Sequence, residues 1–83
     1  MQVTILSHKG VVFEDRAERA EFFSGPQVLS VGDDHQPMVC CADKGFVRLF
    51  GTGSSGKLKK FVISDGVAFI AGNELKIIAE TTG

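Results

Sequence analysis

Apolar and polar residues alternate with a period of two along much of this 83-residue chain, a pattern that indicates half-buried β-strands. The clearest stretch is residues 57–82, with the sequence KLKKFVISDGVAFIAGNELKIIAETT. Its apolar segments are separated by an Asp-Gly pair at residues 65–66 and a Gly-Asn pair at residues 72–73. Both pairs tolerate the positive φ angles of two-residue hairpin loops. The stretch therefore predicts three antiparallel strands joined by two tight turns.

Shorter apolar segments lie upstream, at residues 1–6, 11–13, 28–31, 38–42 and 46–50. In the first of them, Val3 and Ile5 alternate with polar residues, which predicts a strand with one half-buried face. Residues 38–42 are small and apolar at every position, which is typical of a strand buried on both faces. In the last segment, Val47 and Leu49 lie on the side opposite to Arg48.

Two segments lack this alternation. Residues 14–21, EDRAERAE, combine strong helix formers with charges at helical spacing, so composition alone favours a short helix. Residues 32–37, GDDHQP, are polar and end in proline. They predict a loop that crosses from one layer of the fold to another.

Short strands about ten residues apart, punctuated by Gly, Asp and Asn, predict an all-β fold. We expect a small antiparallel β-sandwich or flattened barrel of about eight to ten short strands. It should form a single domain over residues 1–83, without C-terminal helices. A chain of this length has room for one core, but not for a catalytic cleft and a second lobe.

Charge and hydropathy limit the kinds of partner and the cellular location that the sequence predicts. Nine basic residues against ten acidic ones give a net charge of −1, which supplies no electrostatic reason to expect nucleic acid or an anionic membrane. No run approaches the roughly 18 apolar residues of a membrane helix, and no signal-peptide layout is visible. The sequence therefore predicts a soluble, intracellular protein.

One segment imitates a nucleotide-binding motif. Residues 51–57, GTGSSGK, match the GxxxxGK part of a phosphate-binding loop. In that motif a Ser or Thr follows the Lys, and the loop opens a helix whose N-terminal amides face the phosphates. Here Leu58 follows and a strand replaces the helix. We interpret the segment as a flexible hairpin loop.

The remaining reactive side chains form no catalytic or metal-binding pattern. His35 could be a general base or a ligand, but no nucleophile or second ligand is near it in sequence, so a packing or contact role is expected. Cys40 and Cys41 are adjacent, which strains a disulfide, and no second Cys/His cluster completes a metal site. We expect no cofactor, no metal and no catalytic residue.

A small basic cluster falls short of a nucleic-acid patch. It consists of Lys57, Lys59 and Lys60, and lysines also protect exposed sheet edges from unwanted pairing. We expect that protective role here. Asp33, Asp34 and Asp65 are expected to cap turns through nearby backbone amides.

Over nearly its whole length the chain resembles the N-terminal β-sandwich domain of the epsilon subunit of F-type ATP synthase. Residues 3–13 are similar to that family's first apolar strand, its Ser/Thr turn and the aromatic residue before its second strand. Residues 32–38 resemble its Pro-Gly-His-Ala-Pro-Leu loop, with His35 and Pro37 matching. Residues 44–49 resemble its Pro-Gly-Val-Val-Arg-Val strand.

The end of the chain continues the resemblance. Residues 61–67 are similar to the family's hairpin with a Ser-Gly-Gly turn between hydrophobic residues, and residues 75–81 to its Val-Thr-Val-Leu-Ala-Asp-Thr strand. The order and spacing of the motifs together are specific. The resemblance also implies that residues 14–21 continue as strand, against their helical composition.

The resemblance implies a non-catalytic rotor subunit of a proton-translocating ATP synthase, clamping the gamma subunit to the ring of c subunits. Such a protein would lie at the cytoplasmic face of the bacterial inner membrane, attached only through the complex. The implied gamma-facing residues are His35, Pro37 and Met38. The implied c-ring-facing residues are Gly25, Gln27, Val28, Leu29 and Ser30.

Two departures from the family qualify these implications. The family's Gly-Glu-Leu-Gly segment, in a region that touches the c-ring, is matched here by residues 27–30, QVLS, which lack the acidic residue. The family's two C-terminal helices, which restrain ATP hydrolysis or bind ATP, have no counterpart in this sequence. We therefore expect no inhibition of the epsilon type and no ATP site.

Two other classes of function remain open from the residues alone. One is a free-standing β-sandwich interaction module with a different partner, which must leave one apolar patch exposed. The other is an enzyme, which the absence of a nucleophile–base pair or metal spacing disfavours. Alternation alone does not sort the apolar strands into core and contact face.

Overall fold

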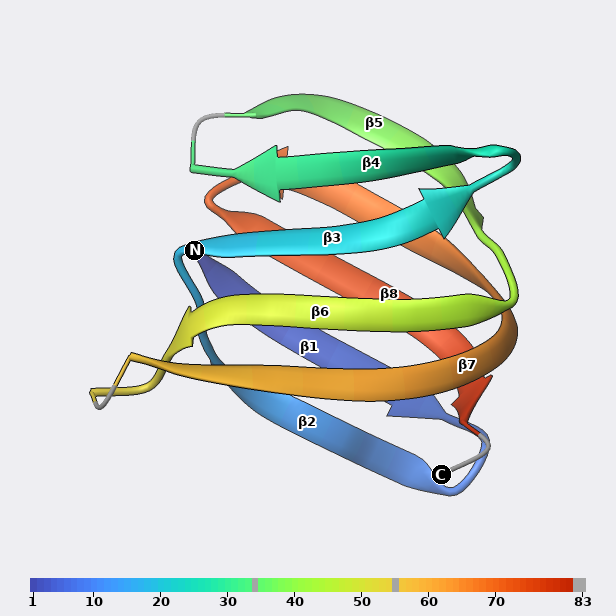
Figure 1. Cartoon of the computed structure of the whole chain (residues 1–83), viewed down its shortest axis with the longest axis horizontal. Helices are drawn as coiled ribbons and strands as arrows, with labels where there is room; N and C mark the ends of the chain where they lie inside the picture. Colours follow the sequence, from blue (N-terminus) through green and yellow to red (C-terminus); the bar gives the residue numbers. More distant parts are fainter. Residues whose placement is uncertain (34, 55, 82–83) are drawn as a thin grey trace.

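The computed structural model describes residues 1–33, 35–54 and 56–81, and eight strands account for most of them (Figure 1). This confirms the predicted all-β class. The described residues contain no helix that is long and apolar enough to span a membrane. The strands are β1 (Gln2–Ser7), β2 (Gly10–Arg16), β3 (Arg19–Ser24), β4 (Gln27–Gly32), β5 (His35–Ala42), β6 (Gly45–Thr52), β7 (Lys57–Gly72) and β8 (Glu74–Thr81).

The strands form two layers that share β7. The five-stranded sheet has the order β2-β1-β8-β7-β5, and the four-stranded sheet has the order β7-β6-β3-β4. The first half of β7 pairs with β6, and its second half pairs with β8 and β5. Figure 1 shows β7 curving from one layer into the other. Neighbouring strands are antiparallel except β1 and β8, which run parallel, so the expected purely antiparallel sheet is corrected at this one pair.

The predicted tight turn at residues 65–66 is wrong. Residues 57–72 are one strand of 16 residues, and the β7–β8 register shifts by one residue between Ile63 and Gly66. A Cβ on Gly66 would collide with the side chain of Ala79 and the carbonyl oxygen of Ile78. Gly66 therefore allows β8 to approach closely at a bulge, and it does not form a hairpin loop.

The predicted turn at residues 72–73 is confirmed. Ala71 pairs with Glu74 across the β7–β8 hairpin, and Gly72 has a φ of 58°. In residues 51–57, Gly51 and Thr52 end β6 and Lys57 begins β7, so the connection lies between Thr52 and Lys57, and residue 55 in it is outside the described residues. A strand and not a helix follows it. The interpretation of that glycine-rich segment as a hairpin loop is confirmed.

The helix that composition favours over residues 14–21 does not form. The segment contains the end of β2 and the start of β3, as the family resemblance implies, with a break at Ala17 and Glu18. The Ala17 amide donates to the Met1 carbonyl at 2.9 Å, and the Glu18 amide donates to the Phe50 carbonyl at 2.8 Å. Pairing with distant strands outweighs the weak local helix preference.

Two expectations about β5 are also wrong. His35 and Pro37 belong to β5 and not to a loop, although the pairing is irregular between His35 and Met38; residue 34 lies outside the described residues. The strand is not buried on both faces, because within the described residues it is a sheet edge that pairs with β7 alone. Ala42 is buried, whereas Val39 is 66% exposed.

The core lies between the two sheets and is built from alternate residues. Val3 and Ile5, predicted to lie on a half-buried face, are fully buried, and so are Val47 and Leu49, for which the sequence predicts only a shared side of their strand. At one open side, the rings of Phe13 on β2 and Phe61 on β7 pack with centroids 5.4 Å apart. The largest fully buried side chains are Phe22, Ile5, Leu49, Ile63, Leu75, Ile77, Val3, Val31 and Val47.

We predict that Gly66→Ala destabilises the protein by about 1–3 kcal/mol, because the added methyl group overpacks the bulge. Gly32→Ala is the matched control: it also lies in a strand, and the nearest atom to its added methyl group would be the Glu18 carbonyl oxygen at 3.8 Å. That control should be neutral or stabilising by up to about 1 kcal/mol. Urea unfolding of the two variants measures the difference, and equal stability would contradict the close-approach role of Gly66.

Candidate interaction surface

The outer face of the five-stranded sheet carries an apolar row that crosses all five strands. Strand pairing places Cys41 beside Val67, Val67 beside Ile78, Ile78 beside Leu6 and Leu6 beside Val11. Since directly paired residues point to the same face of a sheet, these side chains form a continuous line. We call it the apolar row.

A second line beside it extends the apolar surface. Val39 on β5 pairs with Phe69 on β7, and Phe69 pairs with Lys76 on β8. Phe69 is 41% exposed and Ile78 is 46% exposed, although large apolar side chains are usually buried. A contiguous apolar surface of this kind marks a site of protein–protein contact.

A shallow hollow of about 320 Å³ lies on this face. Its walls are Phe69, Ala71, Glu74, Lys76 and Ile78. The apolar side chains can receive an apolar group, while the ammonium and carboxylate at the rim can pair with polar groups around it.

The implied gamma-facing residues lie on β5, beside this face. His35 is half-buried opposite Gly72, and its Nδ1 lies 2.9 Å from the carbonyl oxygen of Gln36. Pro37 and Met38 are exposed. The structure thus brings His35, Pro37 and Met38 into one strand with Val39, at the edge of the apolar surface.

The implied c-ring-facing residues lie elsewhere. Gly25 is in the β3–β4 turn, where its amide donates to the carboxylate of Asp43. Gln27, Val28 and Ser30 are exposed on β4, whereas Leu29 packs against the core. In Figure 1 the β3–β4 turn and the start of β5, where His35 lies, are at opposite ends of the molecule. The two implied contact sets are therefore separate.

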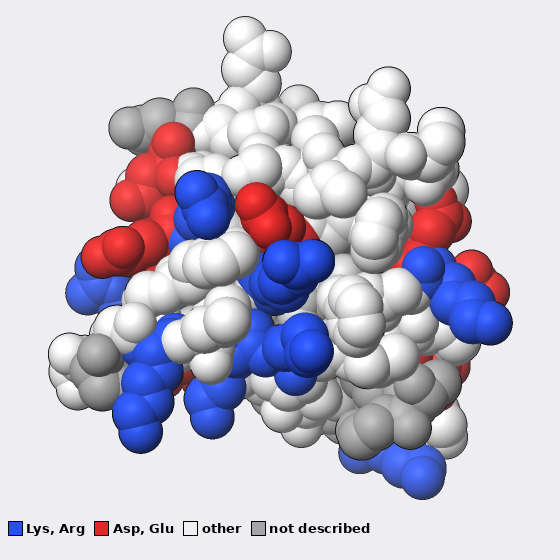
Figure 2. Space-filling view, in the orientation of Figure 1, with Lys and Arg blue, Asp and Glu red and all other residues white. Residues whose placement is uncertain are grey.

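The outer face of the four-stranded sheet is different in character. Figure 2 shows Lys and Arg side chains gathered over its middle and lower part. The Lys60 ammonium lies 4.6 Å from the centroid of the Phe46 ring, and the Arg48 guanidinium carbon lies 6.0 Å from it. The predicted edge role of Lys57, Lys59 and Lys60 agrees with their place in the first half of β7, which among the described residues pairs with β6 and with no other strand over residues 57–60.

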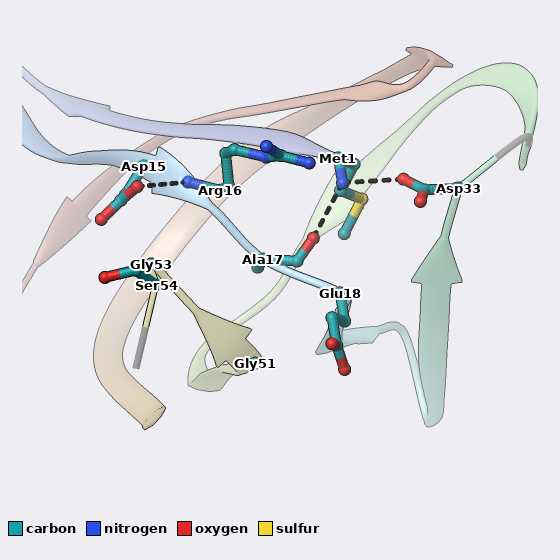
Figure 3. Close-up of a pocket in the computed structure, with 9 residues that line it drawn as sticks. All are labelled: Met1, Asp15, Arg16, Ala17, Glu18, Asp33, Gly51, Gly53 and Ser54. Atoms are coloured by element: carbon teal, nitrogen blue, oxygen red, sulfur yellow. Dashed lines mark hydrogen bonds and ion pairs between the residues drawn. The ribbon is translucent and has the colours of Figure 1, made fainter. Parts of the chain in front are cut away.

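A hollow of about 400 Å³ lies at one end of the sandwich (Figure 3). The Met1 ammonium donates to the Ala17 carbonyl at 2.8 Å and forms an ion pair with Asp33 at 2.7 Å. Asp15 accepts a hydrogen bond from the Arg16 amide. Among the described residues, no three His, Cys, Asp or Glu side chains are grouped to hold a metal ion. These contacts tie chain segments together.

The two cysteines are free thiols in different environments. Cys40 is half-buried, and burial raises its pKa above the ordinary value, against the opposing effect of a hydrogen bond with Ser24. A raised pKa leaves less of the reactive thiolate at neutral pH. Cys41 is exposed in the apolar row.

One exposed pair links the β1–β2 turn to β8. The His8 ring donates from Nδ1 to the Glu80 carboxylate, and the His8 amide donates to its other oxygen at 3.2 Å. The side-chain hydrogen bond, followed by the amide hydrogen bond, lowers the pKa of Glu80 from its ordinary value. The ionised carboxylate is therefore the form that the fold favours.

Two chains in solved structures share this fold. One belongs to the cryo-EM structure of Euglena gracilis mitochondrial ATP synthase, OSCP/F1/c-ring in rotational state 1, with a TM-score of 0.79 and 16% identity over 96% of this chain. The other belongs to the central stalk and c-ring structure of Tetrahymena thermophila mitochondrial ATP synthase, with a TM-score of 0.75 and 13% identity over 96%. The shared feature is the fold.

This chain spans 51% of the first of those chains and 63% of the second. No protein-family model and no curated protein matches the sequence. The β-sandwich expected from the residues is thus confirmed as a known fold, at identities far below those at which residues correspond one to one.

The sequence pattern alone does not reveal the exposed members of the apolar surface. Val67 and Phe69 belong to an apolar run, and Ile78 stands beside the alternating Leu75 and Ile77. The available signal is that Ile78 breaks the alternation by following Ile77 directly. An apolar residue at an outward-facing position of a strand is typical of a sheet that is covered on both faces.

We predict that Glu80 makes stability depend on pH in the acidic range. Because its pKa is lowered in the folded state, its contribution is present above the ordinary value of about 4.3 and is lost as pH falls through the lowered pKa. The melting temperature of the wild type should exceed that of Glu80→Gln at neutral pH, and the difference should shrink on acidification. A difference that stays constant from pH 7 to the acid limit would contradict this assignment.

Proposed function

We propose that this chain is a non-catalytic subunit of the central stalk of a proton-translocating F-type ATP synthase, of the epsilon type, linking the gamma subunit to the c-ring. The observation that carries the proposal is the shared fold with chains of two ATP synthase structures. It is supported by the order of epsilon-like motifs along nearly the whole sequence. An exposed apolar face adds to this support, because a subunit of an assembly needs one.

The separation of the two implied contact sets fits a linking role. The gamma-facing contact is proposed to combine His35, Pro37 and Met38 with the apolar row beside them. The c-ring-facing contact is proposed to use the β3–β4 turn and the exposed residues of β4. The residues proposed for the two contacts lie at different places on one body (Figure 1), which supports the proposal that both partners bind at once.

Transmission of torque requires a body that deforms little under load. The two sheets share β7 and enclose a core whose large side chains are fully buried. Closely packed interiors have low compressibility and transmit strain. In the proposed role, rotation of the c-ring would reach gamma through this body, which would sit at the cytoplasmic face of the bacterial inner membrane and attach only through the complex.

We predict that Val67→Lys weakens binding to gamma about fivefold or more, because it places a charge in the middle of the apolar row. Val62→Lys is the matched control, since both valines lie on β7 and are 39% and 38% exposed, but on opposite sheets. Co-purification of each tagged variant with gamma and with the intact complex measures the effect. Loss of binding in Val62→Lys alone would move the contact to the four-stranded sheet.

We predict that His35→Ala lowers the recovery of gamma and leaves the recovery of the isolated chain unchanged, because His35 lies on β5, the strand that carries Val39 at the edge of the apolar surface. His8→Ala is the control, since His8 is exposed in the β1–β2 turn. If wild-type protein recovers no ATP synthase subunit, the proposed function fails and the chain is an interaction module with another partner.

A further inference from the structure

Among the described residues, the two sheets have four edge strands, and three of them carry features that discourage pairing with another chain. The first half of β7, which pairs with β6, carries Lys57, Lys59 and Lys60. Strand β5 carries Pro37, and its register with β7 is irregular. Strand β2 ends in charged residues and has a register shift of its own. Charged side chains, proline and bulges are the features that protect sheet edges.

Strand β4 has none of these features. Its sequence, QVLSVG, contains no charge and no proline, and its register with β3 is unbroken from Ser24↔Gln27 to Arg19↔Gly32. Within the part of the chain that the structure describes, β4 pairs with no strand other than β3. In Figure 2 the upper part of the molecule, along which β4 runs, shows surface without charged side chains.

The turn before β4 determines which of its backbone groups face outward. Gly25 has a φ of 65° and precedes Pro26 in a two-residue loop flanked by the pair Ser24 and Gln27, as in a type II′ hairpin. The flanking pair of such a loop is hydrogen-bonded, and hydrogen-bonded pairs alternate along the ladder. Residues 27, 29 and 31 therefore bond to β3, and Val28, Ser30 and Gly32 direct their N–H and C=O groups to the free edge.

We propose that β4 pairs with β4 of a second copy of this chain, antiparallel and centred on Ser30. In that register Ser30 faces Ser30 of the second copy, and Val28 faces its Gly32. All three outward-directed residues of the strand then find hydrogen-bonding partners. The arrangement is isologous, so one strand sequence satisfies both sides of the interface.

The side chains of β4 are compatible with this twofold register. Leu29 and Val31, which face the core side, would pair with each other across the interface and so extend the apolar interior from one sandwich to the next. Apolar cross-strand pairs stabilise antiparallel sheets, and no like charges oppose one another here. Because β4 is complementary to itself in this register, we propose a second copy of the chain as its partner and not an unrelated extended segment.

The β4 dimer goes beyond the proposed function, and it is tested on the isolated chain. It would cover the β4 residues assigned above to the c-ring contact, so the dimer would be a form of the free subunit only. If the isolated chain does not dimerise, its co-purification with ATP synthase subunits is unaffected. If it does not co-purify with those subunits, its dimerisation is unaffected. The two proposals therefore fail separately.

The test is the mass of the purified chain, measured by light scattering after size exclusion over a concentration series. The wild type should reach twice the 8.9 kDa mass of one chain. Ser30→Lys should raise the dimer dissociation constant more than about tenfold, because two lysines would face each other at the twofold axis. Ser54→Lys is the control, since it adds the same charge at an exposed residue outside β4 and should dimerise like the wild type.

A second variant tests the backbone pairing itself. Ser30→Pro removes an N–H that points to the free edge and leaves the hydrogen bonds of residues 29 and 31 to β3 in place, so the fold should persist by circular dichroism while the dimer is lost. A wild type that stays monomeric at its solubility limit overturns the proposal. Dimers that survive in both folded Ser30 variants also overturn it, because the contact then lies elsewhere.

Discussion

The fold depends on the continuity of β7. A flat strand of its 16 residues would run about 50 Å, whereas the longest dimension of the molecule is 27 Å. The strand must therefore bend, and it does so at the bulge where Gly66 lets β8 approach. Because β5, β6 and β8 all take their register from β7, the position of this bend aligns the two sheets over a common core.

The second half of β7 is apolar on both faces, and β8 adds Ile78 to the outer one. This property connects the fold to its surface chemistry. Ala68 and Ile70 point into the core, while Val67 and Phe69 point outward into the apolar surface. A side-chain period of two assigns each residue to a face but does not say which face is covered by the same chain. The inward set is covered by the four-stranded sheet, whereas the outward set is exposed.

Sequence alone could predict the class of fold, most of the strands and the alternate residues of the core, but it failed where local chemistry has two structural uses. An Asp-Gly pair suits both a hairpin turn and a bulge, and only the close approach of Ala79 distinguishes them at Gly66. Residues 38–42 look buried because they are small and apolar, but burial depends on the number of neighbouring strands, which composition does not encode. The candidate site follows the same rule. The sequence named His35 through its resemblance to a family motif, but grouping it with Val39 and the apolar row depends on strand order.

The two outer faces of the molecule differ in chemistry, and this difference affects how the molecule can assemble. One face carries the apolar row across five strands, and the other carries Arg48, Lys60 and Glu21 around Phe46. A partner that covers the apolar face gains the hydrophobic contribution of its area, whereas a partner on the charged face must desolvate ionised groups. The difference favours one orientation of the rigid sandwich in an assembly. A body that is both stiff and bound in one orientation can carry force between two partners, which connects the core packing to the proposed role in the central stalk.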